Sequence, residues 1–203
     1  TTRTPAGILY EVDMRLRPWG KDGSLVATLE SYPAYLTKHA RSWEKQALLK
    51  ARFGAGDEQV GKDFLALARP LLFGNSVEAI RQDVHAMKQK TEAYLREKGR
   101  SWGEVKLGEG SIRDVEFVTQ FLQLAHGNQF PEILSVNTLL SIDLLRKNGL
   151  IQINEQRVLE ALQVLLQTRR TGIPTSTPEA LHLVARLARS LGLGVPDARR
   201  LLY

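Results

Sequence analysis

Apolar and charged residues alternate at the start of the chain. Along residues 8–17 the even positions are apolar, and the odd positions from 11 onward are charged. A period of two predicts a strand with one apolar and one charged face. Pro18 ends this strand because proline cannot donate a ladder hydrogen bond. Asp22-Gly23 then predicts the turn of a β-hairpin, whose return strand would cover residues 25–29.

Beyond residue 29 the apolar positions follow helical spacing. Ser76 is the expected N-cap and Gly99 the expected end of one helix, which carries a stripe from Val77 to Tyr94. Trp43 is expected in the core, whereas Glu44 is either paired or a surface charge. The predicted helices cover residues 33–53, 57–73, 76–98, 112–126, 137–148, 154–170, 178–191 and 196–203.

This pattern predicts a mainly α fold with a small N-terminal β-hairpin, in the α+β class. A two-stranded hairpin is marginally stable by itself. We therefore expect the hairpin to end a sheet whose earlier strands precede Thr1, so that the chain is a fragment of a longer protein. The expected division places the end of that α/β domain in residues 1–56 and a helical bundle in residues 57–203.

Composition narrows the possible classes of protein. The 203 residues are 43% hydrophobic and 25% charged, which suits a folded core. No apolar run is long enough for a transmembrane helix, no signal peptide is recognisable, and there is no cysteine, so a cytoplasmic setting is expected. The net charge of +6 is concentrated in residues 1–53 and 157–203. Such basic ends favour a partner rich in phosphate or carboxylate.

Asp13 is the first candidate for chemistry. It shares the charged strand face with Arg15 and Arg17. A carboxylate on a rigid strand suits a metal ligand or a general base, and neighbouring arginines bind phosphate bidentately. The same alternation also fits a solvated strand face, so both interpretations stay open.

A second candidate segment runs from Lys106 to Glu116. Two glycines precede a helix, and Ser111 with Asp114 matches a capping box. A glycine loop at a helix N-terminus is also an anion site, to which Lys106 and Arg113 would add charge. Arg113 and Glu116 begin a polar stripe along this apolar helix, which indicates either a buried polar network or the wall of a cleft.

Three segments together resemble one family, the glutamine synthetase adenylyltransferases. Residues 7–23 are similar to its VDxRLRPxGxxG segment, residues 43–52 to its WExxALxxAR helix, and residues 106–117 to its KLGxGGIRDIEF segment. Ser111 stands where the last pattern has its second glycine, and a residue with a side chain does not easily adopt positive φ. The likeness continues more loosely to about residue 170.

The resemblance implies the fold and the activity. It implies that the hairpin is the remnant of a polymerase-β-like nucleotidyltransferase sheet and that a helical bundle follows. One half of such an enzyme attaches AMP from ATP to a tyrosine of glutamine synthetase, and the other half removes it by phosphorolysis, which yields ADP. The wording of residues 106–114 favours the AMP-removing half.

The resemblance also implies a site. Asp13 matches a catalytic, metal-binding carboxylate that holds Mg²⁺ together with an Asp-x-Asp pair, and two such ions can clamp the attacking and leaving oxygens. This sequence contains no Asp-x-Asp, so the pair is expected upstream of Thr1. The implied nucleotide- or substrate-binding residues are Arg15, Arg17, Lys106, Arg113 and Glu116.

Partners and alternatives follow from the same reasoning. Glutamine synthetase is the expected partner, with the nitrogen-signalling PII protein as a second, and the fragment alone is expected to be inactive. The alternative is a non-enzymatic helical module that docks glutamine synthetase. Nucleic-acid binding is the least supported hypothesis because no DNA- or RNA-recognition signature is present, and no membrane partner is expected.

Overall fold

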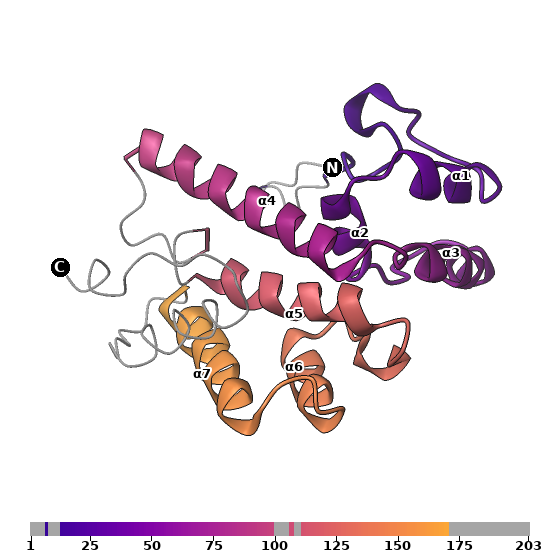
Figure 1. The fold of residues 1–203 in the computed structure, drawn as a ribbon. Coiled ribbons are helices and arrows are strands. Elements are labelled where there is room, and N and C mark those ends of the chain that lie inside the picture. Colours follow the sequence, from indigo (N-terminus) through magenta and orange to yellow (C-terminus); the bar gives the residue numbers. More distant parts are fainter. Residues whose placement is uncertain (1–6, 8–12, 100–105, 108–110, 171–203) are drawn as a thin grey trace.

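The computed structural model describes residues 7, 13–99, 106–107 and 111–170, and this part of the chain is helical (Figure 1). No strand occurs among these residues. The prediction of a mainly α fold is confirmed. The elements are η1 (Gly20–Asp22), α1 (Ser31–Lys38), α2 (Ser42–Leu48), α3 (Glu58–Leu71), α4 (Val77–Glu97), α5 (Ile112–His126), η2 (Pro131–Ile133), α6 (Thr138–Lys147) and α7 (Ile153–Arg170).

Helix α5 lies at the centre of the main core. It packs against α2, α4, α6 and α7, and Figure 1 shows it running between α4 on one side and α6 with α7 on the other. Val115 and Val118 are buried on this helix and meet residues such as Val84, Ile142 and Leu145. The expectation of a largely buried helix over residues 112–126 is therefore confirmed.

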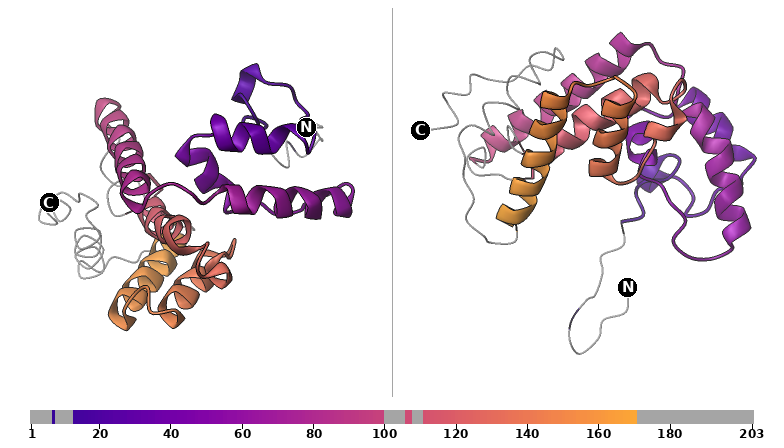
Figure 2. Two further views of the ribbon diagram at one scale, coloured as in Figure 1. Left: turned by 45° about the vertical axis from the view of Figure 1, so that its right-hand side comes forward. Right: turned by 90° about the horizontal axis from the view of Figure 1, so that it is seen from below.

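A second, smaller core joins α1 to α3. Tyr35 and Leu36 from α1 pack with Ala68 from α3, and the edge of this cluster includes Tyr32 and Phe64. The rings of Tyr32 and Phe64 meet edge to face with centroids 4.9 Å apart. Figure 2 shows α1 and α3 side by side, away from α6 and α7. The expected domain boundary at residue 56 stays a prediction.

Several helices begin where the sequence predicts. Asp57 caps α3 by accepting hydrogen bonds from two backbone amides, and Ser76 caps α4 by accepting one from Ala79 N at 3.2 Å. Asn137 caps α6 by accepting from Leu140 N at 3.1 Å. Gly99 follows the end of α4 with φ 64°, a conformation that glycine adopts without steric cost. The helices expected over residues 178–191 and 196–203 lie outside the described residues.

The prediction of an N-terminal β-hairpin is wrong in the part of the chain that the structure describes. Residues 13–17 and 24–28 form no strand, and Leu25 and Val26 are 64% and 84% exposed. Residues 8–12 of the expected first strand lie outside the described part. Asp22 ends a 3₁₀ turn, η1, instead of beginning a hairpin turn. A strand pair needs a third strand or a helix to bury its apolar face, and the exposed side chains of Leu25 and Val26 have neither.

The single helix expected over residues 33–53 is two helices. The Tyr35 carbonyl accepts hydrogen bonds from the amides of His39 and Ala40, which ends α1. Glu44 then reaches back to the Arg41 amide at 3.1 Å and so begins α2. This bend buries Glu44, and it leaves Trp43, expected in the core, 44% exposed.

No helix in the described part of the chain is long and apolar enough to cross a membrane.

Candidate functional site

Asp13 and Arg15 form an exposed ion pair. Arg15 Nη2 lies 2.5 Å from Asp13 Oδ2, and the Arg15 Nε–H donates to Asp13 Oδ1 at 2.8 Å. The backbone amide of Arg15 also donates to Asp13 Oδ1, at 3.0 Å. The side-chain hydrogen bond from Arg15 is the main reason that the pKa of Asp13 falls to about 2. Asp13 is thus an ionised carboxylate at neutral pH, with both oxygens held by Arg15.

Arg17 shapes the loop that follows. Its guanidinium donates hydrogen bonds to the backbone carbonyls of Met14, of Gly23 at 3.3 Å and of Lys21 at 3.4 Å. The loop is tight: a Cβ added at Gly23 would lie 1.9 Å from the Pro18 carbonyl oxygen. The two glycines of the VDxRLRPxGxxG-like segment are required for different steric reasons. Gly23 leaves no room for a side chain, whereas Gly20 adopts φ 57°, which a residue with a side chain rarely does.

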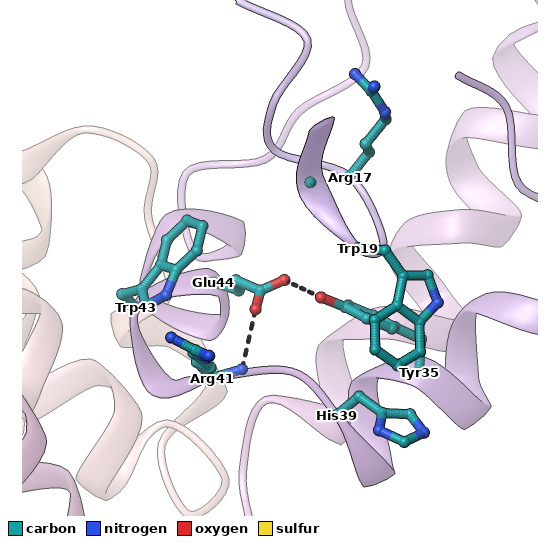
Figure 3. Close-up of a pocket in the computed structure, with 8 residues that line it drawn as sticks. Arg17, Trp19, Tyr35, His39, Arg41, Trp43 and Glu44 are labelled. Atoms are coloured by element: carbon teal, nitrogen blue, oxygen red, sulfur yellow. Dashed lines mark hydrogen bonds between the residues drawn. The ribbon is translucent and has the colours of Figure 1, made fainter. Parts of the chain in front are cut away.

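This loop and the α1–α2 bend enclose a pocket of about 310 Å³ (Figure 3). The loop contributes Arg17, Trp19 and Gly20, and the two helices contribute most of the rest. Three of the lining side chains are basic and three are aromatic. They are Arg17, Trp19, Gly20, Tyr35, His39, Arg41, Trp43 and Glu44.

Glu44 is the buried carboxylate of this pocket. The Tyr35 hydroxyl donates to Glu44 Oε2 at 2.6 Å, and the Arg41 amide donates to Oε1. Burial, together with the hydrogen bond to Glu44, raises the pKa of the Tyr35 hydroxyl. The Tyr35 hydroxyl therefore keeps its proton at neutral pH and stays a hydrogen-bond donor to Glu44. Sequence reasoning left Glu44 undecided, and the signal was its position three residues after Arg41, where a capping carboxylate belongs.

The remaining predicted residues are Lys106, which precedes α5 in sequence, and two residues in the first turns of α5. Lys106 is exposed, and the Arg113 guanidinium lies 5.8 Å from the centre of the Phe117 ring. Glu116 is half-buried and close enough to Lys50 to offset part of the fall in the Lys50 pKa that burial causes. Lys50 Nζ itself donates to Val136 O at 3.0 Å. Asp13 thus pairs with Arg15, and Glu116 lies near Lys50. Neither contact tests metal or nucleotide binding, so those roles stay predictions.

A buried charge cluster at this end of α5 was missed by sequence reasoning. Lys88 Nζ, on α4, lies 2.5 Å from Asp114 Oδ1 and 3.0 Å from Glu92 Oε1. Burial lowers the pKa of Lys88, but the two carboxylates outweigh it and the pKa is raised. The signal was present, because Lys88 continues the spacing of four that joins Ile80 to Val84.

The predicted capping box at Ser111 is wrong. Ser111 makes no side-chain cap, and its buried Oγ has no hydrogen-bond partner among the described residues. The Asp114 carboxylate, which was expected to reach back to the cap, instead pairs with Lys88. The Lys88 ammonium carries a full positive charge where a backbone amide carries only a dipole, so it attracts the Asp114 carboxylate more strongly.

Magnesium needs more donors than the described residues bring together. Carboxylate oxygen is the ligand that Mg²⁺ prefers, and Asp13 is ionised. However, Arg15 occupies both Asp13 oxygens, and no group of three or more acidic or histidine residues capable of holding a metal occurs in the described part. These residues alone do not fit a magnesium site.

Comparison with known proteins gives the family. Residues 1–67 match the family model described as glutamate-ammonia ligase adenylyltransferase. Across 98% of its length the chain is 36% identical to a protein of Cutibacterium acnes and 37% identical to one of Streptomyces coelicolor. Both relatives are named bifunctional glutamine synthetase adenylyltransferase/adenylyl-removing enzyme. The chain belongs to the glutamine synthetase adenylyltransferase family.

A different family model matches the rest of the helical part. Residues 78–197, which include α5 to α7 and α4 from its second residue onward, match the model described as GlnD PII-uridylyltransferase. The pocket and the Asp13–Arg15 pair lie within the part matched by the adenylyltransferase model, and the Lys88 cluster lies within the second part. The chain spans 21% of the length of each of these two relatives.

Proposed function

We propose that this chain is part of a bifunctional enzyme that adds AMP to, and removes AMP from, a tyrosine of glutamine synthetase. The observation that carries the proposal is the likeness over 98% of the chain to relatives of that name. The two family models follow one another along the chain, which supports an end of a nucleotidyltransferase domain followed by a helical bundle.

Within that enzyme, Asp13 is proposed as one carboxylate ligand of Mg²⁺, with the other donors supplied from outside the described residues. Asp13 is an anion at neutral pH, and Mg²⁺ would displace the Arg15 guanidinium from its oxygens. ATP, ADP and phosphate would be the substrates. Arg15, Arg17, Lys106 and Arg113 are proposed to hold or position their phosphates, with Glu116 beside them.

The sequence alone supports the choice between the two activities, the partners and the location. The sequence of residues 106–114 favours the AMP-removing half. The proposed partners are glutamine synthetase and the PII protein, and the proposed location is the cytoplasm. With one metal carboxylate, the 203-residue chain alone should not label glutamine synthetase in the presence of ATP and Mg²⁺.

Substitution of Asp13 in the longer protein that carries this chain tests the catalytic role. Asp13→Asn keeps the shape of the side chain and removes its charge, so we expect at least a 100-fold loss in the rate of AMP addition or removal, measured on purified glutamine synthetase. Mutations that remove one electrostatic catalytic group typically cost about 10²- to 10³-fold. Asp22→Asn is the matched control, because Asp22 is an exposed carboxylate in the same segment.

An unchanged rate for Asp13→Asn would contradict the catalytic role. If neither the parent protein nor Asp13→Asn changed the AMP content of glutamine synthetase, yet both co-purified with it, the non-enzymatic docking module would replace the proposal. Equal losses of rate for Asp13→Asn and Asp22→Asn would indicate a disturbed loop. That result would also contradict the role of Asp13 as a metal ligand.

A further inference from the structure

The N-terminus of α5 holds a buried hydroxyl group that has no partner among the described residues. Ser111, the N-cap residue of this helix, is 1% exposed, and its side chain does not cap the amides of the first turn. Its Oγ forms no hydrogen bond with the residues that the structure describes. The large majority of buried polar atoms in proteins have a hydrogen-bond partner. This hydroxyl group is therefore a candidate donor to a ligand.

The same helix end attracts negative charge. The first amides of an α-helix lack a partner within the helix, and the helix dipole places a partial positive charge beside them. Together with the Ser111 hydroxyl, these amides offer hydrogen-bond donors to one anion, as other helix N-termini do for phosphate. The burial of Ser111 favours a small anion, such as inorganic phosphate, over a whole nucleotide.

The buried charge cluster of Lys88, Glu92 and Asp114 lies beside this end of α5. Asp114 belongs to the first turn, where its amide donates to the Ser111 carbonyl at 3.0 Å. One ammonium, that of Lys88, faces two carboxylates, so the cluster formally carries one net negative charge. The three side chains are 8–9% exposed, and salt screens buried charges weakly. An anion at Ser111 would therefore be affected by the charge of the cluster.

We propose that inorganic phosphate binds at Ser111 on the N-terminus of α5, and that Lys88 sets its affinity by offsetting one of the two carboxylates of the cluster. The inference rests on the proposed function, because phosphate is the substrate that takes up AMP when AMP is removed by phosphorolysis. Lys88 acts through its charge and not by contact with phosphate. Without Lys88, two carboxylates with no cation between them would repel the anion.

Variants that change the charge of the cluster test the proposal. Lys88→Met adds one net negative charge, and Glu92→Gln removes one. NMR titration of the Ile112 and Arg113 amides with inorganic phosphate, on the 203-residue chain, gives the dissociation constant. We expect Lys88→Met to weaken phosphate binding by at least about tenfold and Glu92→Gln to tighten it, because charges in a protein interior interact strongly. A merely structural role predicts the opposite for Glu92→Gln, since this change breaks a buried ion pair and would loosen the helix end.

Two further variants separate charge from stability. The double variant Lys88→Met/Asp114→Asn has the same net charge as the parent chain, so it should bind phosphate about as tightly as the parent does. Ile80→Ala is the matched control for lost stability, because it removes a buried side chain from α4, the helix that carries Lys88, and it should leave phosphate binding unchanged. Circular dichroism shows which variants are folded. If Lys88→Met does not fold, Glu92→Gln and the double variant decide the outcome.

Kinetics in the longer protein that carries this chain give a second readout. The KM for inorganic phosphate in the removal of AMP from purified glutamine synthetase should rise in Lys88→Met and fall in Glu92→Gln. The kcat should change little, because the cluster acts on phosphate binding.

The proposal is overturned if phosphate shifts neither amide, or if Lys88→Met binds phosphate as tightly as the parent chain. It is also overturned if Lys88→Met and Glu92→Gln weaken binding alike. The NMR titration contains no glutamine synthetase, so its failure leaves the proposed transfer of AMP intact. If the chain binds phosphate in the expected order but the longer protein removes no AMP, the phosphate site is supported and the proposed function is contradicted.

Discussion

At the scale of single residues, the Asp13–Arg15 pair sets a measurable pKa. Arg15 lowers the pKa of Asp13 from 3.8 to about 2. Because the folded-state pKa is the lower one, the pair contributes to stability above pH 3.8, and that contribution is lost as the pH falls through about 2. The pair is fully exposed, so salt should screen it.

Arg15→Gln should return the pKa of Asp13 toward 3.8, as measured by NMR titration of its carboxyl carbon. Arg41→Gln is the matched control, since Arg41 makes none of the contacts that lower this pKa. In that control the value should stay at about 2. A pKa that stays at about 2 in Arg15→Gln would show that the guanidinium is not the main cause, and that the backbone amide of residue 15 or another group holds the Asp13 charge.

Residues with local partners were predictable, and those with distant partners were not. The caps Asp57 and Ser76 act on amides two or three residues away, so a short window of sequence contains the whole interaction. Ser111 matched the same local pattern, but its expected partner Asp114 pairs with Lys88, 26 residues away in sequence. Periodicity carries no information about such a contact, because it depends on how two helices cross.

At the scale of elements, the Lys88 cluster fastens α4 to α5. Lys88 and Glu92 lie on α4 and Asp114 lies in the first turn of α5, and the side chains of Lys88 and Asp114 are 8% and 9% exposed. A buried pair adds little compared with apolar residues of the same size, but loss of one member is costly. The cluster should therefore fix the register between the helices.

Lys88→Met should destabilise the chain by about 3–5 kcal/mol, because two carboxylates then stay buried without the ammonium between them. Urea unfolding followed by circular dichroism gives this difference. Lys90→Met is the matched control: Lys90 is an exposed lysine on the same helix, and its replacement should change the free energy of unfolding by no more than about 0.5 kcal/mol. Equal effects of the two substitutions would show that the cluster contributes nothing specific.

The strand prediction failed at this scale for a different reason. Alternation of apolar and charged residues describes a chain that could lie on a sheet, but a strand also needs a neighbour to pair with. In residues 13–28 the polar contacts are local: Arg15 binds Asp13, and Arg17 binds carbonyls within six residues. The apolar side chains of Leu25 and Val26 stay exposed.

At the scale of the whole molecule, the division into a main and a small core was not predictable. Each helix shows an apolar face, but no pattern states which face meets which. The break at residues 39–41 decides the arrangement, because it turns α1 toward α3 while α2 packs on α4 and α5. That break follows from one buried carboxylate, Glu44, whose role the sequence left open.

The two cores should also differ in how they respond to a cavity. Leu36 is buried in the small core and Ile142 in the main core. Replacing either by alanine removes about 2–5 kcal/mol of local packing free energy. The small core contains few buried residues, so Leu36→Ala should open α1 and α3 locally and leave the rest folded.

Hydrogen exchange measured by NMR distinguishes the two outcomes. Leu36→Ala should speed amide exchange in α1 and α3 by about tenfold or more, with little change in α5 and α6, because 1.4 kcal/mol corresponds to a factor of ten. Ile142→Ala should speed exchange in α5 and α6. Uniform acceleration in Leu36→Ala would show that both cores unfold as one unit, so that the pocket depends on the stability of the whole bundle rather than on α1 and α3.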